Sequence, residues 1–406
     1  MAHTDVLIAG AGPAGSALAI RMARAGYRTM VVDRASFPRD KVCAEYMSPA
    51  AVRELDELGV VAALEADGGQ PLAGTTVIGP KGARMTGLFA GADGSRSARS
   101  HGMSIARRLL DDHLVRAARA AGATVHERTT VEELVYDAAA VAGAVVRGPD
   151  GARRVIHARL TVGADGLRSM VARRIGRRRR AALPDRIALV AHVAGVPGLA
   201  DRAEMHVGPG GYVGLNAIGA GVANVALVVP RRRIGSGLRG AGKAALFFKG
   251  LEAFPGVRGR IDPGRVVREV LVTGPFAAWS ARVTAHGALL VGDAADFFDP
   301  FTGDGIYCAL VGARLAAEAA METLSRAGIV TDDRLAGYRA ARRRTFLGKW
   351  IVERLIGYAM FAPWLFDRCV ERLDRRGLAH TLIGVTADLL PARAVLNPVF
   401  LAKMVA

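Results

Sequence analysis

Cysteine is scarce in this sequence: only three occur in 406 residues, at positions 43, 308 and 369. Three widely separated cysteines fit neither a disulfide framework nor the paired spacing of a cysteine zinc site, so we predict no bound metal. No secretory signal precedes the first apolar segment. Together with the unpaired cysteines, this predicts a cytoplasmic protein.

Aromatic residues are also few, at 6%, although the formal net charge is +18. Proteins that bind nucleic acid often interleave basic and aromatic residues on one surface, and no such stretch occurs in this sequence. The excess charge comes mostly from scattered arginines, which we expect on solvated faces. We therefore predict no nucleic-acid partner, with attraction to an anionic membrane surface as the next alternative.

Long apolar runs are lacking as well. The run within residues 351–366 has about a dozen apolar residues, too few to span a bilayer. A basic cluster, Arg342–Arg344, precedes it. We predict that residues 336–406 form a helical cap on the rest of the protein, and the alternative is peripheral contact with anionic lipid. A second basic run, Arg177–Arg180, is predicted to be an exposed loop or helix face.

The most informative stretch is the first one, DVLIAGAGPAGSALAIRMARAGYRTMVVDR. Asp5–Ala9 has the apolar character of a buried strand, Pro13–Ala25 has helical periodicity, and Thr29–Val32 is a second apolar strand. A strand, a glycine-rich turn, a helix and a second strand in this order predict a dinucleotide-binding βαβ unit.

The glycines and the acid of this unit each have a physical role. Gly10 permits the tight turn, Gly12 lets the backbone approach a pyrophosphate, and Gly15 lets the helix pack against the strand. The phosphates are expected on the N–H groups at the positive end of the helix. Asp33 then stands where its carboxylate can accept hydrogen bonds from ribose hydroxyls.

Four further stretches decide between possible dinucleotides. They are SFPRDKVCAEYMSP (36–49), ARRLLDDHL (106–114), VGADGLRSMVARRIG (162–176) and VGDAADFFDPFTGDGI (291–306). With the first stretch, they resemble the glutathione-reductase-type FAD proteins of the p-hydroxybenzoate hydroxylase group. Within that group, the FPRDK and GDAA forms look most like the geranylgeranyl reductase branch.

The resemblance implies FAD as the cofactor and assigns roles around it. Arg107 would neutralise the pyrophosphate or bind the ribityl chain, and Asp293 would bind a ribityl hydroxyl. The backbone from Pro300 to Gly305 would pass beneath the isoalloxazine ring, with a helix dipole directed at the ring from Ile306 onward. Asp165 would fix its loop. The predicted cofactor-binding residues are Gly10, Gly12, Pro13, Ala14, Gly15, Asp33, Arg34, Arg107, Asp165, Asp293, Pro300, Gly303, Gly305 and Ile306.

Three residues are candidates for catalysis. Cys43 and Glu45 follow the second strand in a loop that passes close to the flavin in the proteins that this chain resembles. The alternative for Cys43 is a small buried apolar side chain. Tyr212 lies in a β-rich stretch predicted to carry the substrate pocket. Asn216 is a further polar candidate there, and Asn224 is predicted to be a turn or edge residue.

These patterns predict an α/β fold with three parts. The first is a Rossmann-like FAD-binding domain with a mainly parallel sheet and a β-meander, the second an antiparallel β-sheet substrate domain, and the third a helical C-terminal tail. The predicted boundaries are 1–70, 101–180 and 281–335 for the first, 71–100 and 181–280 for the second, and 336–406 for the third.

The predicted function is that of an FAD-dependent oxidoreductase, with NAD(P)H docking transiently as reductant because no second dinucleotide site occurs. We favour a monooxygenase acting on a lipophilic aromatic or polyketide-like small molecule. The alternative is a geranylgeranyl-reductase-like enzyme acting on isoprenoid double bonds. GGYVGLNAIG (210–219) lacks the aromatic–Trp–Phe–Pro run typical of that branch. A third hypothesis is a non-catalytic flavin electron carrier at a membrane surface.

Overall fold

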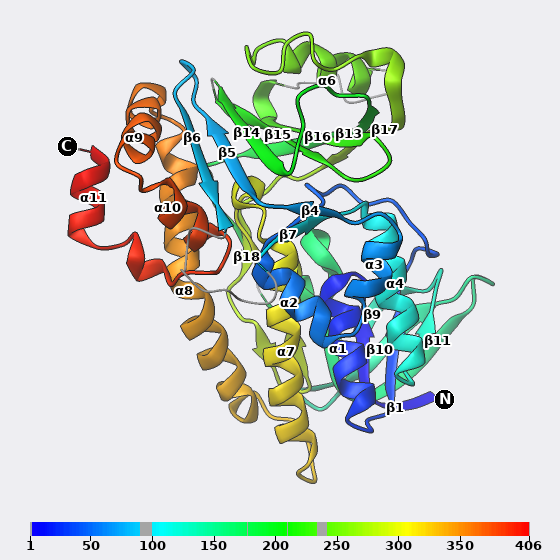
Figure 1. The fold of residues 1–406 in the computed structure, drawn as a ribbon. Helices are drawn as coiled ribbons and strands as arrows, with labels where there is room; N and C mark the ends of the chain where they lie inside the picture. The colour runs from blue at the N-terminus through cyan, green and yellow to red at the C-terminus, as the bar shows by residue number, and fades with distance from the viewer. Residues whose placement is uncertain (1, 90–99, 177, 209, 234–241, 406) are drawn as a thin grey trace.

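The computed structural model describes residues 2–89, 100–176, 178–208, 210–233 and 242–405. Parts of the predicted substrate domain, residues 90–99, 209 and 234–241, lie outside these ranges. Within the described residues, strands between positions 2 and 297 form two large sheets and two small ones. The larger sheets lie one above the other in Figure 1, with the N-terminal helices below and the green strands above.

The first large sheet has the order β19-β20-β11-β1-β2-β8, with β10 and β9 continuing from β11. The β1, β2, β8, β11 and β20 strands run parallel, and β9, β10 and β19 pair antiparallel. The bounds are β1 Ala2–Ala9, β2 Thr29–Val32, β8 Thr124–His126, β9 Thr130–Asp137, β10 Ala140–Arg147, β11 Arg153–Gly163, β19 Thr284–Ala285 and β20 Ala288–Leu290.

Both faces of this sheet are covered, which explains the continuous apolar sequence of β1. Val6 and Ile8 pack with helices α1 (Pro13–Arg24), α4 (Arg107–Ala120) and α7 (Gly305–Leu324) on one face. Leu7 and Ala9 pack with β9, β10 and α5 (Met170–Ile175) on the other. The predicted parallel sheet with a β-meander is confirmed.

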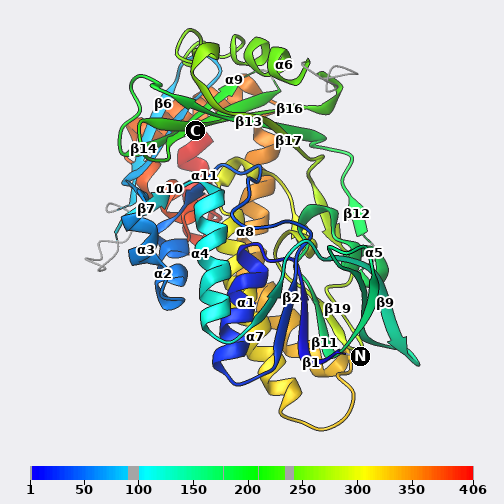
Figure 2. The same ribbon diagram turned by 90° about the vertical axis from the view of Figure 1, so that its right-hand side faces the viewer.

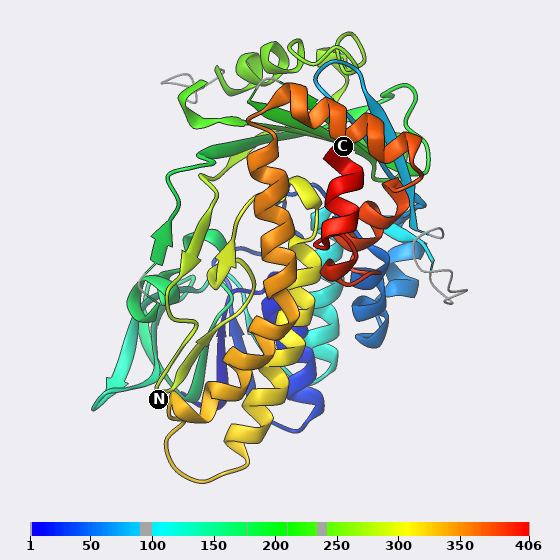
Figure 3. The ribbon, with the colours of Figure 1, turned by 90° about the vertical axis from the view of Figure 1, so that its left-hand side faces the viewer.

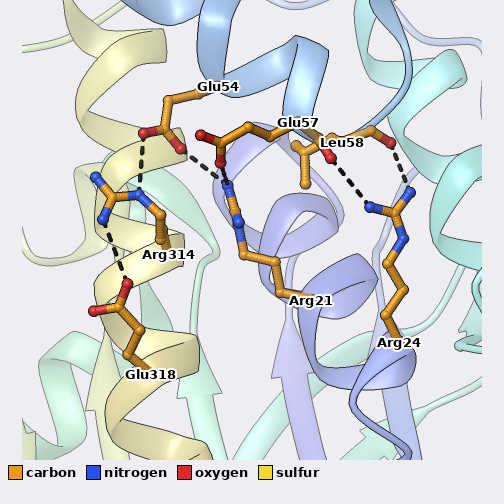
Figure 4. Close-up of polar contacts among 7 residues, drawn as sticks. All are labelled: Arg21, Arg24, Glu54, Glu57, Leu58, Arg314 and Glu318. Carbon is orange, nitrogen blue, oxygen red and sulfur yellow. Dashed lines mark hydrogen bonds and ion pairs between the residues drawn. The ribbon is translucent and has the colours of Figure 1, made fainter.

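Helix α2 (Pro49–Glu57) is held across α1 and α7 by buried and half-buried ion pairs. Glu54 accepts hydrogen bonds from Arg21 of α1 at 3.0 Å and from Arg314 of α7 at 3.1 Å (Figure 4). Arg24 donates to the Leu58 carbonyl at 2.9 Å. These contacts anchor the segment that follows residues 33–45, which are called the Cys43 loop below, and so fix that loop at its C-terminal side. A short helix, α3 (Val61–Ala66), follows.

The second large sheet lies across one end of the first and has the order β17-β13-β16-β15-β14-β5-β6. Adjacent strands of this sheet pair antiparallel, except that β14 and β5 run parallel. Helix α6 (Gly242–Leu251) packs on its outer face through Phe247 and Leu251 (Figures 1 and 2). The strands are β5 Gly74–Ile78, β6 Arg84–Leu88, β13 Arg186–Ala194, β14 Arg202–Gly208, β15 Gly211–Ala217, β16 Val222–Pro230 and β17 Val266–Thr273.

Two small sheets join the larger ones. One contains β3 (Tyr46–Met47), β7 (Gly102–Ser104) and β4 (Gln70–Leu72). The other contains β12 (Arg178–Arg180), β18 (Ala278–Ser280) and β21 (Asp296–Phe297). The prediction of a loop or helix face for the second basic run is therefore wrong for Arg178–Arg180, which pair as a strand with β18. Arg177 lies outside the described residues.

The predicted C-terminal helical region consists of α8 (Ala336–Ala359), α9 (Pro363–Arg375), α10 (Ala379–Thr386) and α11 (Pro398–Val405). Figure 3 shows α8 running beside α7, and α9 and α10 pack on β6. Arg342 is buried and forms an ion pair with Asp296, so it does not face solvent. Among the described helices, none combines the length and the apolar composition that crossing a bilayer requires.

Candidate functional site

The turn between β1 and α1 brings the helix N-terminus close to the sheet. Gly10 has φ +103°, and a Cβ there would lie 2.5 Å from the Ala164 carbonyl oxygen. A Cβ on Gly15 would lie 1.8 Å from the Gly10 carbonyl oxygen. Gly12 caps the helix in an extended conformation, followed by Pro13 and Ala14, and no side chain caps the first turn. Its N–H groups are therefore available to an anion.

Two guanidinium groups lie beside Gly12. A Cβ built on this glycine would be 3.7 Å from one terminal nitrogen of Arg39 and 4.0 Å from one of Arg107. Both arginines are held by the fully buried Asp111, at 3.1 Å and 2.8 Å respectively. Two guanidiniums, one carboxylate and the positive end of α1 leave a net positive site, which suits a doubly charged pyrophosphate.

Arg107 also connects this site to the Cys43 loop. Burial opposes its charged form, but the Asp111 carboxylate and the Cys43 thiol outweigh this effect and raise the pKa of Arg107. The guanidinium lies near enough to the Cys43 side chain for the two groups to interact electrostatically. The backbone N–H of Arg107 donates to Glu45 Oε1 at 2.9 Å. Arg107 thus lies beside both catalytic candidates of the loop.

Asp33 ends β2 beside the glycine turn. Its Oδ2 accepts from the Ala11 N–H and its Oδ1 from the Ala35 N–H, both at 2.8 Å. Each carboxylate oxygen keeps a lone pair for a further donor such as a ribose hydroxyl. The neighbouring Arg34 is exposed.

Asp293 lies in the 3₁₀ turn η5 (Gly292–Ala294), directly after β20 and Val291. Burial raises its pKa, and three nearby cations, Lys41, Arg107 and Arg178, act in the opposite direction. Burial and the two neighbouring arginines in turn lower the pKa of Lys41. The Asp293 carboxylate therefore sits in a partly buried, cation-rich site, where a ribityl hydroxyl can donate to it.

The loops around this site are fixed by local contacts. Asp165 Oδ2 accepts from the Met170 N–H at 2.6 Å, and burial raises the pKa of Asp165. Pro300 opens the turn η6 (Pro300–Thr302), and Gly303 follows it at φ +73°. A Cβ on Gly303 would lie 2.6 Å from the Tyr46 ring, so this glycine permits close aromatic contact. Gly305 and the buried Ile306 begin α7.

The Cys43 loop joins the two large sheets. Glu45 has φ +56°, is buried, and places Oε2 2.6 Å from His192 Nε2 on β13. Asn224 on β16 donates to the Ala44 carbonyl at 2.8 Å. The prediction that Asn224 is a turn or edge residue is wrong, because it is buried in the middle of a strand with neighbours on both sides.

A second polar cluster lies behind the start of α7. Lys349 Nζ is 2.6 Å from both Asp304 Oδ2 and Asp388 Oδ2. Burial raises the pKa of Asp388 to about 7, and burial with the nearby Asp304 raises that of Glu353 well above its usual value. These side chains line a cavity of about 310 Å³ between α7, α8 and the segment after α10. Three carboxyl groups share one ammonium, so the cluster retains a proton near neutral pH.

Comparison with known proteins identifies the family. Residues 3–212, just over half of the chain, match the family described as FAD binding domain. The chain belongs to this FAD-binding family. It is therefore an FAD-dependent oxidoreductase, as the sequence predicts.

Relatives of two kinds align with most of this chain. A menaquinone reductase of Mycolicibacterium smegmatis is 32% identical over 353 residues, 81% of this chain and 78% of that protein. A digeranylgeranylglycerophospholipid reductase of Methanosarcina mazei is 29% identical over 416 residues, 98% and 93% of the two chains.

Solved structures share the fold at lower identity. A flavin-dependent brominase has a TM-score of 0.80 at 21% identity, covering 94% of this chain and 93% of the brominase. A geranylgeranyl bacteriochlorophyll reductase-like protein from Thermoplasma acidophilum has a TM-score of 0.77 at 22% identity, covering 97% and 96%. These matches confirm the predicted fold class.

The residues of the FAD-binding end fit the cofactor. The uncapped α1 terminus and the Arg39–Arg107 pair suit its pyrophosphate, Asp33 suits its adenosine ribose, and Asp293 suits its ribityl chain. These assignments remain predictions for each residue. The structure adds Arg39 and Lys41, which stand in the FPRDK motif but were not predicted as site residues.

Tyr212 is a buried residue of β15. Its hydroxyl donates to Asp299 at 2.6 Å, and Asp299 also pairs with the buried Arg186 at 2.9 Å. Burial and the adjacent Asp299 raise the pKa of Tyr212 well above its usual value. The geometry gives Tyr212 a place in a buried hydrogen-bond network, and its catalytic role stays a prediction.

Proposed function

We propose that this protein is an FAD-dependent reductase that saturates a carbon–carbon double bond in the isoprenoid chain of a lipid. Menaquinone and digeranylgeranylglycerophospholipid, the compounds in the names of its relatives, are both lipids with isoprenoid chains. The two reductases match most of this chain at 29–32% identity. At 21% identity, the similarity to the brominase shows a shared fold alone.

The observation that carries this proposal is the position of the Cys43 loop. The Arg107 N–H donates to Glu45 Oε1 of this loop at 2.9 Å, and the Arg107 side chain lies near both Cys43 and Gly12 of the predicted FAD site. Saturating a double bond adds one hydride and one proton. FAD, when bound and reduced by a nicotinamide dinucleotide, supplies the hydride. Cys43 would give its thiol proton to the second carbon of the double bond, and the Arg107 cation would stabilise the thiolate left behind. Glu45 would hold the loop in place through Arg107 and His192.

The monooxygenase remains the second candidate. It is favoured by GGYVGLNAIG, in which the aromatic–Trp–Phe–Pro run of the geranylgeranyl reductase branch is missing. A hydroxylation would require no proton donor at Cys43. The two functions therefore differ in their dependence on this thiol as well as in their products.

The lipid substrate gives a reason for contact with a membrane. Leu347, Ile351, Leu355 and Tyr358 are 41–51% exposed, and their spacing puts them on one face of α8. The exposed Arg343 and Arg344 lie one turn before this apolar stripe. Together with the net charge of +18, this supports docking on a bilayer with acidic head groups.

Product analysis tests the proposed reaction. The FAD-loaded protein is supplied with a reductant and an isoprenoid lipid under argon, and the lipid is analysed by mass spectrometry. We expect a product that has gained two hydrogen atoms. Cys43→Ala should lower kcat at least about 10-fold with FAD still bound, and Cys308→Ala serves as the matched control. A product that forms only with oxygen and contains a new oxygen atom would support the monooxygenase instead.

A further inference from the structure

A row of buried polar side chains crosses the inner face of the second large sheet. Arg268 on β17 is paired in register with His192 on β13, His192 with Asn224 on β16, and Asn224 with Asn216 on β15. Residues opposite one another in adjacent strands project on the same face. The polar row therefore consists of Arg268, His192, Asn224 and Asn216, and it faces the Cys43 loop.

Several atoms of the polar row lack hydrogen-bond partners among the described residues. They are all three nitrogens of the Arg268 guanidinium, Asn224 Oδ1 and Asn216 Nδ2. The Arg268 side chain is 10% exposed, and Asn216 and Asn224 are buried. An unpaired buried polar atom destabilises a folded protein, and a charged one does so more strongly. A run of such atoms on one face therefore indicates that a ligand completes their bonding.

The charges around Arg268 restrict the ligand. One terminal nitrogen lies 3.8 Å from Asp40 Oδ1 and 3.8 Å from Glu45 Oε1, too far for hydrogen bonds but close enough for electrostatic compensation. An anionic ligand next to these two carboxylates would be repelled. A neutral carbonyl oxygen can accept from the guanidinium without adding charge.

The same face becomes apolar away from the polar row. Val190 and Ala226 form the next cross-strand pair on this face, and Ala188 and Val228 the one beyond. A ligand whose polar end binds the polar row would therefore have the buried apolar side chains of these strands next to it. A polar end beside apolar surroundings suits a lipid head group that continues into a hydrocarbon chain.

We infer that Arg268 recognises a neutral, carbonyl-bearing group at the polar end of the lipid substrate, with the Asn216–Asn224 pair binding the next polar group along the row. This inference rests on the proposed function for the nature of the substrate. To the proposed function it adds which part of the sheet binds the substrate and which chemical group is recognised there. Arg268 is a positioning residue, since it binds a group remote from the double bond.

Binding of two matched probes tests the inference. Farnesylacetone has an isoprenoid chain with a neutral ketone, and farnesyl phosphate has a comparable chain with an anion. Both are titrated into the oxidised, FAD-loaded protein, and binding is followed by the visible absorbance of the flavin and by equilibrium dialysis. No reduction takes place, so the result does not depend on whether the proposed reaction occurs.

We expect Arg268→Met to weaken farnesylacetone binding at least about 10-fold and to leave FAD affinity within about 2-fold, because only the ketone loses its donor. Arg268→Lys, which keeps the charge but loses the planar fork, should give an intermediate loss. Arg265→Met is the matched control, since Arg265 is exposed and lies three residues away. If Arg268→Met does not fold, Arg268→Gln replaces it and should also weaken ketone binding.

Three results would overturn the inference. Unchanged ketone binding in the Arg268 variants would mean that water alone satisfies the polar row. Loss of FAD with ketone binding intact would assign Arg268 to the cofactor. Tighter binding of farnesyl phosphate than of farnesylacetone, lost on substitution of Arg268, would mean that the row takes an anion.

Discussion

The FAD-binding end and the inner face of the second large sheet recognise their ligands in opposite ways. At the FAD end, the main chain around Gly10, Gly12 and Gly15 forms the site, and the buried charges of Arg107 and Asp111 are paired. On the sheet face, side chains from four strands form the site, and many of their polar atoms are unpaired. The FAD end is preorganised without a ligand, whereas the polar row requires a ligand to complete its hydrogen bonds.

The difference has a consequence for tolerance to substitution. A site formed by close main-chain contacts cannot accept an added methyl group without moving the backbone. A site formed by side chains on a sheet can lose one contact and keep its fold. Substitutions at the FAD end should therefore affect folding and cofactor binding together, and substitution of Arg268 in the polar row should affect substrate binding alone.

The largest effect is expected at Gly15. In Gly15→Ala, the new Cβ would lie 1.8 Å from the Gly10 carbonyl oxygen, so α1 must move away from β1. We expect a loss of at least about 3 kcal/mol in the free energy of unfolding and loss of bound FAD. Chemical denaturation and the flavin content of the purified protein measure these two effects.

The control for this change is Gly337→Ala in α8, where an added Cβ meets nothing within 4 Å. It should be neutral or stabilising by up to about 1 kcal/mol, because alanine has the higher helix propensity. If Gly15→Ala keeps its full flavin content and its stability, close main-chain packing at Gly15 is not what forms the FAD end.

The next effect concerns the buried cluster behind α7. Lys349→Met leaves Asp304, Asp388 and Glu353 with no ammonium group between them. Removing one member of a buried ion pair costs about 3–5 kcal/mol. The control is Lys243→Met, because the ion pair between Lys243 and Glu269 is largely exposed. This variant should change the free energy of unfolding by less than about 1 kcal/mol, and denaturation midpoints compare the two variants. Equal losses in both variants would contradict the pairing.

A smaller effect is expected from pH. Burial raises the pKa of Asp388 from 3.8 to about 7, so the unfolded chain releases this proton at lower pH than the folded chain. The contribution of Asp388 to stability should therefore fall as pH rises from about 4 to about 7. Glu353, whose pKa is also raised, acts in the same direction.

Asp388→Asn removes one of these two titrations. Its free energy of unfolding should decline less between pH 5 and pH 8 than that of the unsubstituted protein, with a difference on the order of 2 kcal/mol. Urea denaturation at several pH values measures both slopes. If the free energy of unfolding has the same pH dependence in both proteins, the titrating group is not Asp388.

The smallest effect concerns the stripe on α8. Leu355→Glu adds a negative charge to an exposed apolar position, so stability should change by less than about 1 kcal/mol. Co-sedimentation with acidic phospholipid vesicles should fall several-fold, while Tyr136→Glu, an exposed residue on β9, should leave it unchanged. Loss of a dimer without loss of vesicle binding would assign the stripe to a second copy of the chain.

Local sequence predicted the FAD end well. The strand Thr29–Val32 has the predicted bounds, and the helix predicted over Pro13–Ala25 ends one residue earlier, at Arg24. Both follow from apolar periodicity and glycine positions within a short segment. Arg107 and Asp293 could be singled out because they stand in local patterns that a family shares.

The polar row could not be predicted in the same way. It depends on the register between β15, β16, β13 and β17, which no local pattern of residues specifies. Asparagine generally favours turns, but Asn224 pairs with strands on both sides, so tertiary pairing overrides this local preference. Lys349, Asp304 and Asp388 likewise come from three separate segments, so their proximity is a result of tertiary packing.

The most direct test of the central claim is the reoxidation of the reduced, FAD-loaded protein by an isoprenoid lipid in the absence of oxygen. The flavin is first reduced by dithionite under argon, a lipid with an unsaturated isoprenoid chain is added, and visible absorbance is followed. The account predicts that the absorbance of oxidised flavin returns under argon, with one saturated double bond formed for each flavin. Absorbance that returns only after oxygen is admitted, with a hydroxylated product, would contradict it.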